Sequence, residues 1–290
     1  MLAEVDGHGI TVAGEMADDD AGHIGSVMQD GRAGSSPLLH RGDAEPFIVD
    51  REHGTSPFVL VCDHAGRAVP GGLNLDVPPA DMDRHIAWDI GAGALSLLLG
   101  ERLNACLIRQ PYSRLVIDCN RDPARADAMP EVSDGTRVPA NTGLNTAGRA
   151  ARVTAVHEPY HARLAALLDA RVAAGRTTVL GLIHSFTPAM RGAARPWTYG
   201  VLHTGQPLAL ATLARLRAAR VGKVGDNEPY AMDAVDYTAG RHGTARGIDF
   251  VEVEVRQDLI KEKEGQESVA AMLAGVLGAA LADITHDDFS

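Results

Sequence analysis

Short apolar runs alternate with longer amphipathic segments along the chain from about residue 56 onward. A short apolar run bounded by polar or Gly/Pro residues is typical of a buried strand, and apolar residues spaced three or four apart are typical of a helix. The amphipathic segments predict helices over residues 81–103, 147–174, 208–220 and 267–281, the second broken or restarted at Pro159. The short runs predict strands at residues 58–62, 105–108, 115–117, 178–183, 197–202 and 250–255.

Strands that alternate with helices form a sheet covered on both faces. We therefore predict an α/β fold, a three-layer α/β/α sandwich with a mixed, mostly parallel sheet. Ligands of such sheets bind at the carboxyl ends of the strands. Polar residues that directly follow an apolar run are thus the first candidates for chemistry.

Residues 1–45 differ from the rest, because Gly, Asp, Ser and Ala dominate and large apolar residues are scattered. We interpret them as a loosely structured N-terminal extension, and residues 46–290 as a single domain. The alternative is an arm that docks on a partner subunit. The oligomeric state is left open, and a homo-oligomer is one option.

The chain of 290 residues contains 27 Lys and Arg against 38 Asp and Glu, a formal charge of −11. This charge argues against a nucleic-acid binder, which needs a basic field to neutralise phosphates. It allows a local basic pocket for a small anionic substrate. The three cysteines form no CxxC pair, no signal peptide is visible, and no apolar run reaches about 18 residues. We therefore expect a cytoplasmic protein without a membrane span.

Two histidines stand at the ends of the two most apolar predicted strands. His64 follows the first of them, and His184 follows the run at 178–183. Imidazole is a common zinc ligand, and hydrolytic zinc sites combine three protein ligands with one open position. Asp89 could supply the third ligand, with His85 beside it on one face of the predicted helix. The competing interpretations are hydrogen-bonded loop histidines and an ordinary helical side-chain pair.

The segment His157-Glu158-Pro159-Tyr160-His161 matches the H-E-x-x-H motif of zinc proteases in letters only. That motif needs an uninterrupted helix, and Pro159 lacks an N–H and fits only the first turn of a new helix. We expect the two histidines to flank a helix entry. A role for His161 in a pocket formed elsewhere is kept open.

Charged residues surround two further runs. Arg114 and Arg121 flank residues 115–117 and could bind a substrate carboxylate, or form salt bridges with nearby aspartates. Alternation over 250–258 puts Glu252, Glu254 and Arg256 on one face of a strand. A glutamate near a metal-activated water is the usual general base of such hydrolysis, whereas the competing interpretation is a charged edge strand.

Seven motifs stand in an order that resembles the N-formylglutamate amidohydrolase family, and the resemblance covers about residues 56–283. The motifs are Cys62-Asp63-His64-Ala65-Gly66, His85-Ile86-Ala87-Trp88-Asp89-Ile90-Gly91-Ala92, Ser113-Arg114-Leu115-Val116-Ile117-Asp118-Cys119-Asn120-Arg121, Pro159-Tyr160-His161, Ile183-His184-Ser185-Phe186-Thr187-Pro188, Asn227-Glu228-Pro229-Tyr230 and Glu254-Val255-Arg256-Gln257-Asp258-Leu259.

The resemblance implies a zinc-dependent amide hydrolase, with one divalent metal per chain, on the fold shared by zinc carboxypeptidases and aspartoacylase. The family reaction releases formate from an N-formyl amino acid, N-formyl-L-glutamate in histidine breakdown. Residue matching makes His64 and His184 metal ligands. The carboxypeptidase pattern H-x-x-E fails because Arg67 stands third after His64, so we take Asp89 as the carboxylate ligand.

The resemblance also assigns roles to Glu254 and to the pair Asn120-Arg121. Glu254 falls at the position of the catalytic glutamate and acts as general base for the attacking water. Asn120-Arg121 is similar to the substrate-binding Asn-Arg pair of aspartoacylase-like relatives. The predicted site has Glu254 and Arg114 as catalytic residues; Asn120, Arg121, His161, Asn227, Tyr230, His242 and Arg256 as substrate-binding residues; and His64, Asp89 and His184 as metal ligands.

One departure bears on the substrate. Dedicated deformylases of histidine breakdown carry a Pro-His-Ser-Gly type first motif, whereas this chain has Asp63-His64-Ala65-Gly66. The expected substrate is a small anionic N-acyl amino acid of the N-formylglutamate type. The alternatives are hydrolysis of another N-acyl amino acid or a small peptide, and a metal-free binding module of the same fold.

Overall fold

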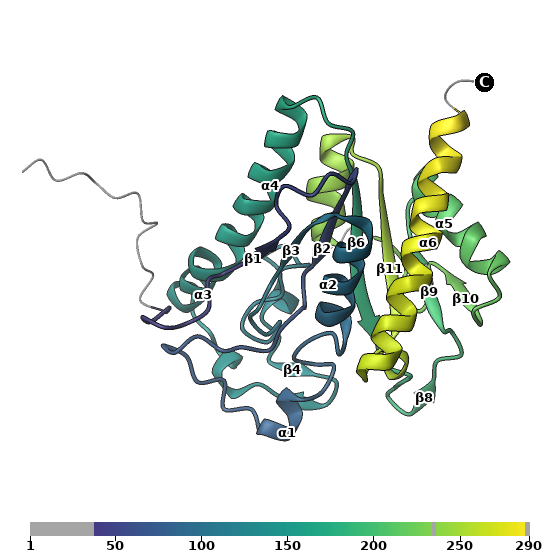
Figure 1. Cartoon of the computed structure of the whole chain (residues 1–290). Coiled ribbons are helices and arrows are strands. Elements are labelled where there is room, and N and C mark those ends of the chain that lie inside the picture. The colour runs from purple at the N-terminus through teal and green to yellow at the C-terminus, as the bar shows by residue number, and fades with distance from the viewer. Residues whose placement is uncertain (1–37, 234–235, 288–290) are drawn as a thin grey trace, which may run out of the picture. The chain divides into compact units, whose positions relative to one another are not determined.

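A computed structural model describes residues 38–233 and 236–287, which lie in one compact unit (Figure 1). The strands of the main sheet are β1 (Ile48–Asp50), β2 (Phe58–Cys62), β3 (Cys106–Arg109), β6 (Val179–Phe186), β9 (Tyr199–Leu202), β10 (Val224–Asp226) and β11 (Phe250–Arg256). The helices are α1 (Pro79–Met82), α2 (Ala92–Leu103), α3 (Thr146–Arg152), α4 (Glu158–Ala173), α5 (Pro207–Ala218) and α6 (Lys263–Asp287). Two small hairpins are formed by β4 (Val132–Ser133) with β5 (Thr136–Arg137), and by β7 (Ala189–Met190) with β8 (Ala193–Ala194).

The sheet has seven strands in the order β1-β3-β2-β6-β11-β9-β10. The four pairs β3–β2, β2–β6, β6–β11 and β9–β10 are parallel, and the pairs β1–β3 and β11–β9 are antiparallel. The prediction of a mixed, mostly parallel sheet is therefore confirmed.

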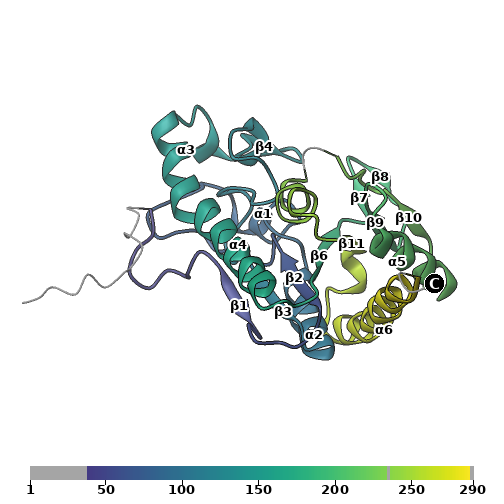
Figure 2. The ribbon, with the colours of Figure 1, turned by 90° about the horizontal axis from the view of Figure 1, so that it is seen from above.

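Helices cover both faces of this sheet, which gives the predicted three layers (Figure 2). Successive side chains of a strand point to opposite faces. Accordingly, Val59 and Val61 of β2 belong to the core beneath α4, and Phe58 and Leu60 to the core beneath α2 and α6. The central strands β2 and β6 are buried along their whole length, which explains why they read as unbroken apolar runs.

The chain reverses its direction of travel across the sheet between β2 and β6. It leaves β2, crosses one face through α2 and enters β3 on one side of β2. It then crosses the opposite face through α3 and α4 and enters β6 on the other side of β2. Loops that diverge in this way open a crevice at the carboxyl ends of the two strands, the usual ligand position in such folds.

The predicted strand at 115–117 is wrong. Leu115, Val116 and Ile117 lie in a turn and are fully buried in the core beneath α4, so their apolar character reflects burial and not strand pairing. Distant side chains satisfy the backbone there, as a buried loop requires. The Leu115 carbonyl accepts from Asn141 Nδ2 at 3.0 Å, and the Val116 carbonyl from Arg152 Nη1 at 2.9 Å.

The single helix predicted for residues 81–103 is also wrong, because α1 and α2 are separated by turns over residues 83–91. Gly91 ends this connection with φ +81°, a conformation that favours glycine. A Cβ atom at Gly91 would lie 2.2 Å from the Ile260 carbonyl oxygen. The helical periodicity of the segment thus stops where the chain must pass close to another backbone.

The helix predicted for 147–174 is nearly continuous. α3 runs into a π-helical turn over Val153–His157, which leads directly into α4. Pro159 lies in the first turn of α4, the position that a proline tolerates. The wider π turn before it is a common adjustment where the regular hydrogen-bond ladder is interrupted.

The last helix is longer than predicted. Over Lys263–Thr285 it is long and apolar enough to cross a membrane by length and composition, with a mean hydropathy of 1.7. Its residues Leu273 and Leu277 belong to the core, and the helix packs against α2 and α5. The pattern therefore matches a core helix of this fold.

Residues 38–45, assigned to the extension by composition, make specific contacts with the domain. Leu38 belongs to the core, the Asp43 carboxylate accepts from the Gly71 N–H at 2.8 Å, and Tyr112 donates its hydroxyl to the Ala44 carbonyl at 2.5 Å. The remainder of the predicted extension, residues 1–37, lies outside the described residues.

Candidate active site

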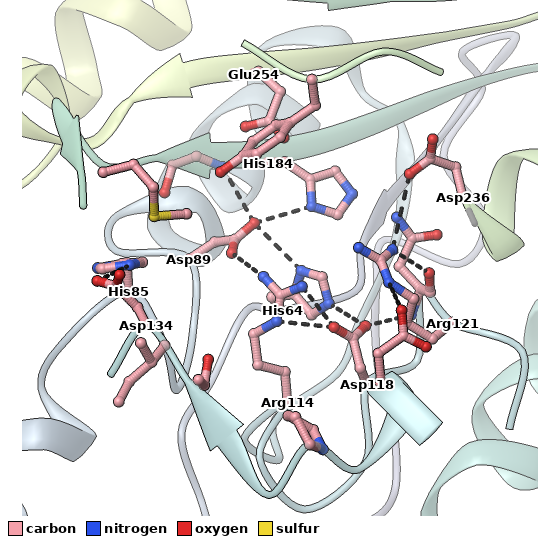
Figure 3. A pocket seen from close by; sticks show the side chains of 18 of the residues that line it. His64, His85, Asp89, Arg114, Asp118, Arg121, Asp134, His184, Asp236 and Glu254 are labelled. Atoms are coloured by element: carbon pink, nitrogen blue, oxygen red, sulfur yellow. Dashed lines mark hydrogen bonds and ion pairs between the residues drawn. The ribbon is translucent and has the colours of Figure 1, made fainter. Parts of the chain in front are cut away.

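Three side chains from distant parts of the sequence converge at the carboxyl ends of β2 and β6. These are His64, Asp89 and His184, and their ligand-type atoms all lie within 4.8 Å of one another. All three are buried. Figure 3 shows the Asp89 carboxylate beside both imidazole rings, with an interaction to each. Among the described residues, no other group of histidine, cysteine and carboxylate side chains meets this geometry.

The local backbone explains this convergence. His64 is the second residue after β2, and His184 lies near the carboxyl end of β6, which extends to Phe186 and not to residue 183 as predicted. Asp89 lies in the turn before α2, where its N–H donates to the His64 carbonyl at 3.0 Å. That bond ties the turn to the end of β2.

The predicted pairing of His85 with Asp89 on one helical face is wrong, since neither residue is helical. His85 Nε2 lies 3.4 Å from Asp134 Oδ2 instead. Asp89 Oδ2 accepts from His184 Nδ1 at 2.9 Å and lies 3.4 Å from His64 Nδ1. Burial is the largest cause of the lowered pKa of His85.

A second carboxylate stands behind each histidine. His64 Nε2 is hydrogen-bonded to Asp118 Oδ1 at 2.7 Å, and His184 Nε2 lies 3.5 Å from Asp63 Oδ2. Burial opposes a positive charge on both rings, yet the surrounding carboxylates outweigh it and raise the pKa of each histidine. Carboxylates behind ligand histidines orient the rings and increase their basicity in many metal sites.

Buried polar atoms without hydrogen-bond partners cluster at this place. Native proteins leave few such atoms, and each one calls for a bound ion, water or ligand. A divalent cation fits these residues, because buried carboxylates surround the paired imidazoles and outnumber Arg114, the arginine that forms ion pairs with two of them. The unpartnered atoms among the described residues include His64 Nδ1, His184 Nε2, Asp63 Oδ2, Glu252 Oε2 and Glu254 Oε2.

Glu252 and Glu254 both enter the site from β11, whose register pairs Glu254 with His184 of β6. Strand alternation puts both carboxylates on the same face, as predicted, and both side chains line the pocket. Burial raises the pKa of Glu252 to about 8 and that of Glu254 to about 7. The idea of a half-exposed edge strand is wrong, since β11 is central and buried.

Arg114 is held by two of these acids. Its Nε and Nη2 atoms donate to Asp118 Oδ2 at 2.9 and 2.5 Å, and Nη1 donates to Asp89 Oδ1 at 3.4 Å. The same guanidinium lines the pocket. Asp118 thus joins Arg114 to His64 in one network (Figure 3).

A pocket of about 460 Å³ opens above these groups. The predicted substrate-binding residues Asn120, Arg121 and Tyr230 line it. Arg121 lies 3.9 Å from Asp236 and 3.7 Å from Asp127. Apolar side chains such as Met190 and Leu202 complete the wall.

Four other predicted substrate-binding residues do not line this pocket. His161 and His242 stack on each other with ring centroids 5.2 Å apart. Asn227 donates to and accepts from the His203 backbone, and Arg256 forms an ion pair with Asp258. The contacts of these four side chains thus lie outside the pocket lining.

The two histidines of the segment that matches H-E-x-x-H are hydrogen-bonded to backbone carbonyls. His157 Nε2 donates to the Arg121 carbonyl at 3.1 Å, and His161 Nε2 donates to the Cys119 carbonyl at 2.9 Å. Because a carbonyl oxygen can only accept, both Nε2 atoms carry a proton. Neither ring lies in the three-residue cluster. The expectation that this motif is not a zinc-protease helix agrees with this placement.

Sequence reasoning missed the two carboxylates behind the histidines and the β7–β8 hairpin. Asp63 directly precedes His64 and is fully buried, and Asp118 stands four residues after Arg114. An acidic residue next to a strand-end histidine was the available signal. The hairpin carries Met190 and Arg191, which both line the pocket.

Comparison with known proteins bears on this site. The family model of N-formylglutamate amidohydrolase matches residues 56–261. Among solved structures, the gene product Atu2144 from Agrobacterium tumefaciens is 36% identical, with a TM-score of 0.83 over 86% of this chain and 99% of that one. N-formylglutamate amidohydrolase from Ralstonia eutropha JMP134 is 18% identical, with a TM-score of 0.63 over 84% of this chain and 100% of that one, which concerns the fold alone.

No significant similarity to a curated protein sequence is found. The family match nevertheless spans well over half of the chain and includes the strands and turns that carry His64, Asp89, His184 and Glu254. The chain belongs to the N-formylglutamate amidohydrolase family.

Proposed function

We propose that this protein is a metal-dependent amide hydrolase that cleaves an N-formyl amino acid, or another N-acyl amino acid, of the N-formylglutamate type. The observation that carries the proposal is the buried His64–Asp89–His184 cluster beside Glu254, at the floor of a pocket, in a chain of this family. Two imidazoles and one carboxylate are a common ligand set of hydrolytic zinc sites.

His64, Asp89 and His184 would hold one divalent metal, for which zinc is our first choice. When bound, such an ion polarises the amide carbonyl and lowers the pKa of an attacking water. Asp118 and Asp63 keep the two rings oriented toward this centre. Their burial excludes bulk water from the back of the cluster.

Glu254 is the proposed general base. It takes a proton from the attacking water and delivers it to the leaving nitrogen. Its buried Oε2 atom has no hydrogen-bond partner among the described residues, and its strand register places it beside His184. This unpartnered oxygen is the atom that we assign to proton transfer.

The pocket arginines are the proposed contacts for negative charge. Arg114 is fixed by Asp118 and Asp89, and we assign it to the amide oxygen as that atom becomes negative. Arg121, with Asn120 beside it, is assigned to a substrate carboxylate. Both assignments are supported by their place in the pocket wall.

A panel of N-acyl amino acids tests the function. Purified protein is assayed for release of the free amino acid from N-formyl, N-acetyl and N-succinyl derivatives, and its metal content is measured in parallel. We expect close to one zinc per chain and release of formate and amino acid from at least one N-formyl substrate. Faster cleavage of an N-acetyl or N-succinyl derivative would mean that the natural substrate carries another acyl group. Protein that contains no metal and binds these compounds without cleaving them would favour the binding module.

A further inference from the structure

The β7–β8 hairpin brings a positive charge to the edge of the pocket. Arg191 and Gly192 form its two-residue turn and have φ values of +50° and +79°. Such turns favour Asn, Asp or Gly at the first position, because side chains of other residues resist positive φ. Arg191 lines the pocket and is exposed, whereas the His64–Asp89–His184 cluster is buried. Arg191 therefore lies at the rim and the cluster at the floor.

The three arginines that line the pocket differ in their partners. Arg114 forms ion pairs with Asp118 and Asp89, and Arg121 lies within 4 Å of Asp127 and Asp236. Arg191 forms no ion pair or hydrogen bond with any residue that the structure describes. Of the three, Arg191 therefore has the least compensated positive charge.

The acidic residues of the rim have partners of their own. Asp127 forms an ion pair with Arg125, and Asp134 with Arg84. Because these carboxylates are already neutralised, they do not compete for Arg191. Asp236, a further acid of the pocket lining, lies 3.9 Å from Arg121.

The base of the hairpin is fastened to the pocket wall. Arg195, just after β8, donates its N–H to the Pro188 carbonyl at 2.8 Å and Nη1 to the Tyr230 hydroxyl at 2.9 Å. Its guanidinium also stacks 4.7 Å from the Tyr230 ring and 5.9 Å from the Phe186 ring. Since Tyr230 lines the pocket, these contacts hold Arg191 near the substrate space.

We propose that Arg191 is a specificity-determining residue, which binds a carboxylate on the part of the substrate far from the amide that is cleaved. This inference rests on the proposed function and deepens it. A guanidinium at the rim can bind the side-chain carboxylate of a substrate through a bidentate pair of charge-assisted hydrogen bonds. Arg121, deeper in the wall, is left for the other carboxylate of an acidic N-acyl amino acid.

The kinetic test uses N-formyl-L-glutamate and N-formyl-L-glutamine, which differ only by a carboxylate in place of a carboxamide. Wild type should favour the glutamate derivative at least about tenfold in kcat/KM. Arg191→Ala and Arg191→Gln should lose this preference through a higher KM for the glutamate derivative, with kcat for the glutamine derivative kept. The matched control Arg137→Ala removes an exposed hairpin arginine outside the pocket and should behave as wild type.

Calorimetric binding of L-glutamate and L-glutamine to the same proteins separates this inference from the hydrolysis itself. A preference for L-glutamate that vanishes in Arg191→Ala supports the assignment even if no substrate is cleaved, a result that would count against the proposed function alone. A preference that survives in Arg191→Ala overturns the assignment. So does a wild type that binds both amino acids equally and cleaves both derivatives equally.

Discussion

The molecule contains two groups of buried histidines that look equivalent by composition and differ in their neighbours. His64 and His184 lie among aspartates at the floor of the pocket. His157, His161 and His242 lie outside the pocket lining. His157 and His161 are hydrogen-bonded to backbone carbonyls, and His161 is hydrogen-bonded to His242. The second group contains the better match to a known zinc motif, and the first group contains the candidate metal site.

The difference shows in the pKa of each ring. Carboxylates raise the pKa of His64 and His184 in spite of burial, whereas burial lowers the pKa of His161 to about 3 and that of His242 to about 4. A histidine among carboxylates attracts a cation, and one among carbonyls and rings stays neutral. Buried acids nearby thus distinguish the candidate metal site from the other histidines, which their spacing along the chain does not.

The largest expected effect comes from removing a ring of the first group. His64→Ala and His184→Ala should lose bound zinc and lower kcat by on the order of a thousandfold or more. The reason is that loss of the ion also removes the polarisation of the amide carbonyl. Asp89→Ala should do the same. Metal analysis and initial rates on one preparation measure both effects.

His157→Ala is the matched control from the second group and should keep its zinc. Loss of zinc in this variant would contradict the proposed difference between the two histidine groups and restore the zinc-protease interpretation of the H-E-x-x-H segment. Full zinc occupancy in His64→Ala or His184→Ala would remove that residue from the ligand set.

The next effect concerns the two glutamates of β11. Glu254→Gln keeps the size of the side chain but cannot take a proton, so kcat should fall about a hundredfold or more. Zinc content and KM should stay within a few-fold of wild type. Glu252→Gln is the matched control and should retain most activity. Reversed results would make Glu252 the base.

A smaller effect should follow from the carboxylates behind the rings. Asp118→Asn and Asp63→Asn should weaken zinc binding about 10- to 100-fold while the fold persists, because each aspartate orients one histidine. Competition with a chromogenic chelator measures this affinity. Asp127→Asn removes the charge of a pocket acid outside the cluster and should leave zinc affinity unchanged. Equal losses of zinc affinity in all three variants would mean that the net negative charge of the pocket, and not the orientation of the rings, controls zinc binding.

The smallest effect is a pH dependence of stability. The pKa values of His161 and His242 are lowered from 6.5 in the folded state, so the unfolded chain binds more protons between about pH 6.5 and about pH 4. Each ring should therefore reduce the free energy of unfolding as the pH falls, by at most about 1.4 kcal/mol per pH unit. Chemical denaturation of wild type and His242→Gln should show a shallower slope in the variant, and identical slopes would show that these rings do not control acid stability.

The fold was largely predictable because burial imposes a pattern. β2 and β6 are buried on both faces, so their residues are apolar throughout and mark the centre of the sheet. The same rule misleads at Leu115–Ile117, where burial occurs without strand pairing. The edge strands β1 and β10 are only three residues long, too short for alternation to show.

The sequence alone also proposed His64 and His184, from their place at the carboxyl ends of strands. It proposed Asp89 and the glutamates of β11 from residue spacing and the family resemblance, and the structure brings all of these side chains to one pocket. It could not distinguish Arg114 and Arg121, which have aspartate partners, from Arg191, which has none among the described residues. Nor could it show that His161 and His242 stack behind the pocket. Hydrophobic periodicity records which side chains are buried, whereas the partner of a buried charge depends on strand order and loop paths that bring distant residues within a few ångströms, and only the tertiary structure decides those.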